Sequence, residues 1–293
     1  MNFTDALEQA LLDADAPVIT AYGLFVLGRN LFEQRDWRGE PLKRMPPVWD
    51  QAGARNAISR LVERRFLVSD VDFGSGVWRV VQSARSGSAE EVACIADPFA
   101  YVSHLSAMQR YGLTERSPGA LHLTTPARAV WNRLRDEKVG RELAGVPEGE
   151  RPSLSKPGFS DTIRRRPVLV HETRHPAAPV SVRGESARVT SIGRTFADML
   201  SEPGLCGGVR HVLDIWERDA EQWAPEIIGE VDRVHSQIVK VRAGYLLSEV
   251  LGVEDPRIDG WRRFAQRGGS RKLDPDGPYA PRFSDAWMIS LNA

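Results

Sequence analysis

The hydrophobic pattern opens with two helical stretches. Apolar side chains recur every three or four residues along 4–14 and again along 18–33, which places them on one face of a helix. Pro17 suits the first position of the second helix, where a missing N–H costs no hydrogen bond. A polar, proline-bearing connection follows over 36–49. The chain therefore begins with two amphipathic helices and an irregular link.

A third helix and a hairpin come next. The pattern predicts a helix over 50–64 and two short strands at 66–71 and 77–81. Glycines in the joint between the strands permit the positive φ that a tight hairpin needs. Helix, turn, helix and then a glycine-tipped hairpin is the layout of a winged helix-turn-helix domain. We expect this domain over residues 1–85, with the small polar run 83–89 as a linker.

From Cys94 onward the pattern mixes helices with strands, which predicts a second domain over 93–293 and an α+β fold overall. A helix is predicted at Phe99–Tyr111 and a long loop over 135–160. Strands are predicted at Ala120–Thr124, Val168–Glu172 and Val180–Val182, and helices at Ile192–Leu200, Gly207–Asp219 and Pro225–Leu251, the last one broken. Aromatic side chains beyond Pro256 are expected to pin the C-terminal tail to the body; they are Trp261, Phe264, Tyr279, Phe283 and Trp287.

Composition places the chain among ordinary globular proteins. Its 293 residues, 42% of them hydrophobic and 27% charged, suffice for two domains with sizeable cores. Cys94 and Cys206 lie far apart and outside any CxxC spacing, which indicates a reduced compartment. The N-terminus lacks the pattern of a signal peptide, and no apolar run reaches the ~20 residues of a membrane span. We expect a cytoplasmic, nucleoid-associated protein with no membrane partner.

Charge is balanced over the whole chain but uneven along it. Residues 29–85 hold eleven Lys and Arg against seven acids, whereas the first 28 residues hold four acids and no basic side chain. One face of the first domain is therefore expected to be basic, as contacts to DNA phosphates require.

The 50–64 helix divides into an apolar and a polar side. On a helical wheel the predicted core face is Ala54, Ala57, Ile58, Leu61 and Val62, and Glu63 falls on the opposite side. Asn can pair with adenine and Arg with guanine in the major groove. The predicted DNA-binding residues are Arg55, Asn56, Ser59, Arg60, Arg64, Arg79, Lys43 and Arg44. An ordinary solvated helix face would give the same pattern, and Arg79 could contact phosphate or only solvent.

A second basic cluster lies in the following domain. Residues 151–194 hold nine Lys and Arg against three acids, most densely at Arg164, Arg165 and Arg166. This patch could extend the DNA footprint, face a tRNA or a protein toxin, or be solvated surface.

Several segments of the second domain resemble the AbiEi family of bacterial antitoxins. The resemblance covers about 96–251 and is carried, in order, by Ala96–Met108, Tyr111–Thr114, Leu121–Pro126, Arg188–Ser191, Arg194–Leu200, Cys206–Val209 and Lys240–Leu247. The last 40 residues show no match. The resemblance implies an antitoxin that represses its own promoter through inverted repeats and antagonises an AbiEii-like nucleotidyltransferase toxin through its C-terminal domain. Direct sequestration of the toxin, by protein–protein contact, is the alternative.

The matches to sequence motifs of enzymes are weak. His171–His175 spells HExxH, the zinc motif of metalloproteases, but Pro167 and Pro176 flank a strand-like run, in which the two histidines would lie ~13 Å apart. His104 lacks a GxSxG turn and is expected to be a buried, hydrogen-bonded histidine. Residues 268–272 lack the spacing of a phosphate loop. The sequence thus predicts no catalytic residue, no metal and no cofactor, and the chain is not expected to be an enzyme.

Overall fold

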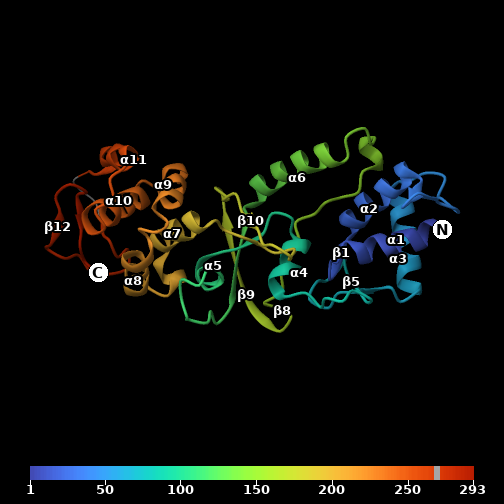
Figure 1. Cartoon of the computed structure of the whole chain (residues 1–293), viewed down its shortest axis with the longest axis horizontal. Helices are drawn as coiled ribbons and strands as arrows, with labels where there is room; N and C mark the ends of the chain where they lie inside the picture. Colours follow the sequence, from blue (N-terminus) through green and yellow to red (C-terminus); the bar gives the residue numbers. More distant parts are fainter. Residues whose placement is uncertain (267–270) are drawn as a thin grey trace. The chain divides into compact units, whose positions relative to one another are not determined.

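The computed structural model describes residues 1–266 and 271–293, so most of the glycine-rich run 268–272 lies outside the described residues. Within them it contains eleven α-helices and several small sheets, which confirms a mixed α and β fold (Figure 1). The chain divides into two compact units. The first is Met1–Tyr101, Leu123–Arg174 and Ser181–Arg188, and the second is Val102–His122, His175–Val180 and Val189–Ala293. The linker predicted at 83–89 falls inside the first unit.

Three helices form the N-terminal part of the first unit: α1 (Phe3–Asp13), α2 (Ala21–Gln34) and α3 (Gln51–Glu63). A short strand, β1 (Val18–Thr20), precedes α2, and Thr20 caps that helix by accepting a hydrogen bond from the Gly23 N–H at 3.0 Å. The prediction that Pro17 opens the helix is therefore wrong, since a threonine side chain satisfies the free N–H instead. The connection to α3 contains a small hairpin of β2 (Asp36–Trp37) and β3 (Glu40–Pro41).

The predicted hairpin is confirmed. Strands β4 (Leu67–Ser69) and β5 (Val77–Val80) pair antiparallel, and β1 pairs with the other edge of β5 to give the order β1-β5-β4. Gly76 adopts φ +80°, a backbone conformation that favours glycine. The hairpin is thus the outer part of a three-stranded sheet.

The core of these helices centres on Trp49, the residue just before the N-cap of α3. Its indole is buried, its Nε1 donates to the Phe25 carbonyl at 2.9 Å, and its ring centroid lies 5.2 Å from that of Phe3. A Cβ added at Gly28 of α2 would come within 2.1 Å of the indole. The bare backbone of α2 therefore lets the ring pack directly against the helix.

Two helical elements differ from the sequence-based expectations. The chain over 99–111 does not form one helix, because Tyr101–Val102 is a buried strand (β6) and the helix α5 covers only His104–Arg110. A short helix that the sequence analysis missed, α4 (Ala89–Ala96), begins with a reciprocal capping box between Ser88 and Glu91.

The helix α6 (Arg128–Glu142) occupies much of the stretch predicted as a loop. Only Trp131 of this helix is buried, so its sequence lacks the apolar stripe by which an amphipathic helix is recognised. Ion pairs one turn apart stabilise it instead, between Arg133 and Glu137 at 3.0 Å and between Lys138 and Glu142 at 2.5 Å. The loop prediction holds for the remainder, apart from a 3-10 turn at Glu148–Glu150.

Six strands form the largest sheet, in the order β10-β11-β6-β7-β9-β8. The three predicted strands are confirmed within it as β7, β9 and β10. Strand β11 pairs parallel with β6, and β8 pairs antiparallel with β9. The bounds are β7 (Leu121–Pro126), β8 (Thr162–Ile163), β9 (Arg166–Thr173), β10 (Val180–Ser181) and β11 (Arg188–Val189).

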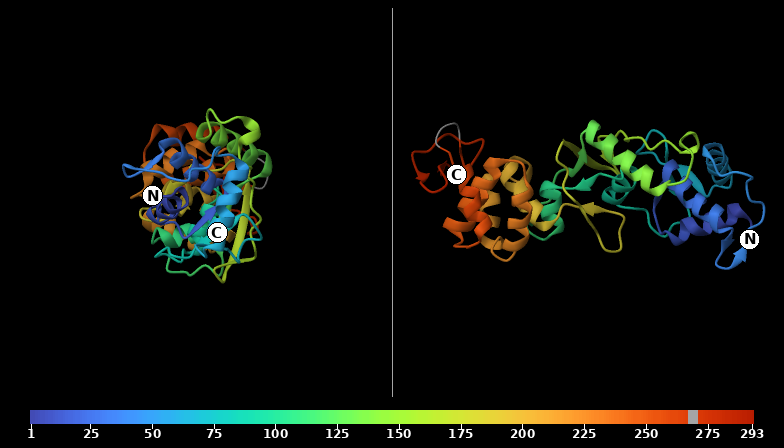
Figure 2. Two further views of the ribbon diagram at one scale, coloured as in Figure 1. Left: turned by 90° about the vertical axis from the view of Figure 1, so that its right-hand side faces the viewer. Right: turned by 90° about the horizontal axis from the view of Figure 1, so that it is seen from above.

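The predicted C-terminal helices are confirmed, and Figure 2 shows them gathered in one bundle (orange). The long stretch 225–251 is broken at 234–236, as expected, and ends in a π-helical turn at Leu246–Val250. Gly193 permits close packing of two helices, since its Cβ would lie 2.2 Å from the Glu226 carbonyl oxygen. The bounds are α7 (Ile192–Ser201), α8 (Val209–Asp219), α9 (Ala224–Arg233), α10 (Gln237–Tyr245) and α11 (Pro256–Trp261).

The C-terminal tail is pinned to this bundle, as the aromatic residues suggested. Trp261 and Trp287 are fully buried, and Trp287 packs on Gly244, whose Cβ would lie 2.1 Å from the ring. Phe264 contacts the same core at its edge. Tyr279 and Phe283, the latter at the start of a short hairpin of β12 (Phe283–Ser284) and β13 (Ile289–Ser290), are about half exposed. For these two residues the prediction was wrong.

The packing of Trp49 predicts the effect of a methyl group at Gly28. We expect Gly28→Ala to lower the free energy of unfolding by about 1–3 kcal/mol, because the indole must move and the core has no room for it. Gly140→Ala is the matched control, since a Cβ at this exposed α6 position meets nothing within 4 Å. It should leave stability unchanged or raise it by about 0.5–1 kcal/mol. Urea unfolding of both variants measures the difference, and equal midpoints would contradict this account.

Candidate nucleic-acid interface

Helix α3 turns one side to the core and the other to solvent. Asp50 caps it by accepting from the Gly53 N–H at 2.7 Å. The predicted core side is buried at Ala54, Ala57, Ile58 and Leu61. Val62 is 40% exposed, so its assignment to the core was wrong. It follows Leu61 directly and is therefore rotated about 100° from it around the helix axis.

The outward side of α3 carries short polar and basic groups. Arg55, Asn56, Ser59 and Arg60 are exposed, as the wheel predicted. The Ser59 hydroxyl donates to the Arg55 carbonyl at 3.1 Å, within the helix itself. Among the residues that the structure describes, no carboxylate forms an ion pair with Arg55 or Arg60. Their guanidinium groups are thus available to an external acceptor.

Arg64, the C-cap of α3, is engaged inside the protein. Its guanidinium contacts Asp5 and Glu8 of α1, each at 2.9 Å. The hydrogen bond from Arg64 holds the pKa of Asp5 below its usual value. Arg64 therefore ties α1 to the end of α3, and its contact with DNA would compete with these two carboxylates.

All four acidic residues among the first 28 lie near an arginine of the protein. Besides Asp5 and Glu8, Asp13 pairs with Arg38, and Asp15 lies 3.8 Å from Arg85. The basic excess that the sequence shows over 29–85 is consequently reduced by acids from an earlier segment, and the remaining positive charge is concentrated at fewer side chains.

A groove beside α3 gathers several predicted DNA-binding residues. It has a volume of about 340 Å³ and is lined by three arginines, two acids and three further residues: Arg44, Arg60, Arg64, Asp5, Glu63, Asn2, Phe3 and Thr4. Lys43 is exposed. Its backbone forms hydrogen bonds with Met1 and Phe3 at 2.8 and 2.9 Å, which places it beside the groove. The arginines are suited to phosphate oxygens. Of the two acids, Asp5 is paired with Arg64, so Glu63 is the carboxylate that opposes an anion in this groove.

Arg79 lies in a different cluster, on β5 close to Asp70. Asp70 is buried at the end of the hairpin's first strand and accepts from Arg164 at 2.6 and 3.1 Å. Burial acts to raise the pKa of Asp70, but hydrogen bonds from Arg164 and the Asp72 N–H, with the charges of Arg164 and Arg79, hold it below its usual value. No pattern in the sequence predicts this long-range pair.

The tip of the hairpin is held by the turn between β8 and β9. Asp72 contacts the Arg164 guanidinium and accepts from the Arg164 N–H at 3.0 Å. The Ser160 hydroxyl donates to the Asp72 carbonyl at 2.9 Å, and Phe73 packs edge-on against Phe159. The predicted wing is thus fastened along one side, while Gly74 and Ser75 remain exposed.

The predicted second basic patch is largely neutralised. Arg164 is paired with Asp70 and Asp72, and Arg166 contacts Glu90 at 3.0 Å. Only Arg165 of the three is exposed and pairs with no carboxylate among the described residues. The cluster of three arginines in the sequence therefore leaves one arginine, Arg165, available to a nucleic acid.

Comparisons with known proteins add little to this site. No family model matches the chain, and no curated protein matches it either. Among solved structures the chain is similar to the Rv2827c protein of Mycobacterium tuberculosis, at 12% identity and a TM-score of 0.45, over 98% of this chain and 90% of that one. A TM-score below 0.5 at this identity does not establish a shared fold or function. No helix in the described residues is long and apolar enough to cross a membrane.

The Arg164 clamp predicts a pH-dependent loss of stability. At pH 7 we expect Arg164→Gln to lower the free energy of unfolding by about 1–3 kcal/mol, because it leaves two buried or half-buried carboxylates without their partner. The pKa of Asp70 is depressed, so its stabilising pair is present above the carboxyl's unfolded pKa and is lost as pH falls through the folded one. The difference between variant and wild type should therefore shrink in acid.

Arg165→Gln is the control for this experiment, because the neighbouring side chain is exposed. Its unfolding midpoint should match that of the wild type at every pH. Should Arg165→Gln destabilise as much as Arg164→Gln, or should the Arg164→Gln deficit stay constant with pH, the clamp would not have the role assigned to it.

Proposed function

We propose that this chain is a sequence-specific DNA-binding antitoxin that represses its own promoter. The observation that carries the DNA-binding half is α3: one side is clamped to the core, and the other presents Arg55, Asn56 and Arg60 beside a groove that contains Arg44. A recognition helix needs both, since it must be rigid and must bring polar side chains to base edges.

The order of elements supports the interpretation as a winged helix-turn-helix. Helices α2 and α3 are followed by the β4–β5 hairpin, whose sheet is completed by β1. In this arrangement α3 enters the major groove, and the groove-lining arginines meet the flanking phosphates. Because the hairpin tip is fastened by Arg164, we assign the wing a supporting contact at Arg79 and the specific contacts to α3.

The antitoxin half of the proposal rests on the sequence resemblance. Residues from the resembling segments make buried polar contacts: Asp97 accepts from Thr125 and Trp131 at 2.6 and 2.9 Å, and Arg188 donates to three backbone carbonyls. In the second unit Arg242 donates to the Leu200 carbonyl at 2.6 Å. Such contacts stabilise the fold of these segments. The proposed partner is a nucleotidyltransferase toxin, antagonised either directly or indirectly.

Substitution of Arg60 tests the recognition helix. Arg60→Ala should weaken binding to the chain's own promoter by about 5- to 150-fold, the equivalent of about 1–3 kcal/mol for one base contact, and should affect scrambled DNA much less. Arg79→Ala should weaken both DNAs alike, as loss of a phosphate contact does. Fluorescence anisotropy with labelled duplexes measures all four affinities.

Arg133→Ala provides the control, because it removes an exposed arginine of α6 and should leave both affinities unchanged. If Arg60→Ala binds the promoter as tightly as the wild type does, α3 is not the recognition helix.

A second experiment separates repression from toxin antagonism. The full-length chain with Arg55, Asn56 and Arg60 all changed to alanine should lose repression of a promoter–reporter fusion yet still rescue cells that express the neighbouring toxin gene. The three side chains are exposed, so the protein should keep its wild-type unfolding midpoint. Death of those cells, with the variant folded and abundant, would mean that antitoxicity needs the DNA-binding surface.

A further inference from the structure

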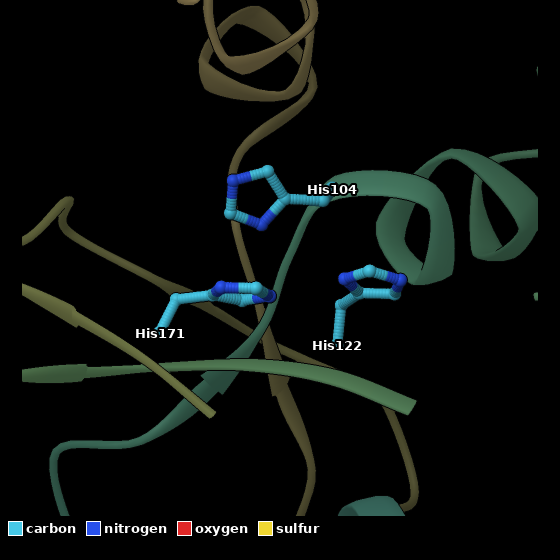
Figure 3. A group of neighbouring side chains, drawn as sticks. All are labelled: His104, His122 and His171. Atoms are coloured by element: carbon cyan, nitrogen blue, oxygen red, sulfur yellow. The ribbon is translucent and has the colours of Figure 1, made fainter. Parts of the chain in front are cut away.

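The HExxH run takes no part in the proposed function. Figure 3 shows His171 on β9, and neighbouring residues of a strand point to opposite faces, so Glu172 points away from it. Glu172 pairs with Lys156 at 2.5 Å. The run therefore lacks the helical arrangement that brings both histidines of the metalloprotease motif to one metal.

An acidic side chain lies among the predicted DNA contacts. Glu63 is the last residue of α3, is exposed, and lines the same groove as Arg44 and Arg60. No lysine, arginine or histidine forms an ion pair with it in the part of the chain that the structure describes. The other acid of the groove, Asp5, is paired with Arg64. Glu63 is thus an unpaired carboxylate on the surface proposed to face DNA.

A carboxylate at this position is unfavourable in two ways. The C-terminal end of a helix carries a partial negative charge, which repels an acid in the last turn. The phosphates of bound DNA repel Glu63 as well, and they oppose the attraction that Arg44 and Arg60 supply. A hydrogen bond accepted from a base offsets this repulsion.

The edges of the bases select the partner of Glu63. An ionised carboxylate can only accept hydrogen bonds. In the major groove guanine and thymine present acceptors, adenine presents its N6 donor beside the N7 acceptor, and cytosine presents its N4 donor alone. Because the adenine N7 repels a carboxylate, cytosine is the base that fits. We propose, on the basis of the DNA binding proposed above, that Glu63 accepts a hydrogen bond from the N4 amino group of an operator cytosine.

Arg60 and Glu63 then recognise neighbouring bases. They are three residues apart, which separates them by about 4.5 Å along the helix axis. Stacked base pairs are about 3.4 Å apart. The two side chains, which line one groove, therefore address the same base pair or adjacent ones. Since Arg60 donates to guanine O6 and N7, the operator is expected to contain guanine and cytosine beneath the end of α3.

Replacement of Glu63 by glutamine tests this assignment through a change of base preference. The full-length chain is titrated with its own promoter site and with duplexes in which each base pair of that site is changed in turn. At one cytosine, replacement of the base should cost the wild type about 5- to 150-fold in affinity. Glu63→Gln should prefer adenine there, because a glutamine amide pairs with adenine N6 and N7.

Glu63→Ala should bind all four bases alike at this position. It should also bind scrambled DNA more tightly than the wild type does, since a charge repelled by the phosphates is removed. The unfolding midpoints of both Glu63 variants should equal or exceed that of the wild type, because the acid opposes the helix dipole.

Glu148→Gln is the matched control, since it removes an exposed glutamate outside α3 and should change neither the base preference nor the affinity for scrambled DNA. The assignment is overturned if the wild type distinguishes its promoter from scrambled DNA but Glu63→Gln keeps the same preference at every position. It is also overturned if Glu148→Gln has the same effects as Glu63→Gln. If the wild type does not distinguish the two DNAs, the proposed function fails together with it.

Discussion

The contact between the Trp49 indole and the bare backbone at Gly28 fixes the position of α3. The indole lies between α1 and α2 and bonds to the Phe25 carbonyl, and the chain continues from it through the Asp50 cap into α3. Without a side chain at position 28 the ring packs directly on α2. The direction in which Arg55, Asn56 and Arg60 point follows from this one packing arrangement.

Electrostatics then selects which of the basic side chains can act outside the protein. Acids of α1 and the following turn occupy Arg64, Arg38 and Arg85, and the hairpin acids occupy Arg164. The pairs of Arg64, Arg38 and Arg85 are partly exposed and contribute little stability each, unlike the buried pair of Arg164 with Asp70. Their effect is on the surface. They leave Arg44, Arg55 and Arg60 among the side chains that can contact DNA without breaking an ion pair inside the protein.

The sequence predicted what depends on local periodicity and missed what depends on distant partners. The α3 wheel, apart from Val62, and the hairpin with its glycine were correct, because burial period and positive φ are local properties. Helix α6 was missed since ion pairs replace its apolar stripe, and α4 was missed although Ser88 and Glu91 form a recognisable capping box. The Arg164 clamp joins Asp70 to a residue 94 positions further along the chain, and no spacing in the sequence predicts this pair.

The central claim is that this surface distinguishes one DNA sequence from another. Its most direct test is the affinity of the wild-type chain for its own promoter and for a scrambled duplex of equal length, measured over a series of salt concentrations. We predict tighter binding to the promoter at every salt concentration, with both affinities falling linearly on logarithmic axes as counterions compete for the phosphates. Equal affinity for the two duplexes, or no binding at low salt, would contradict the account.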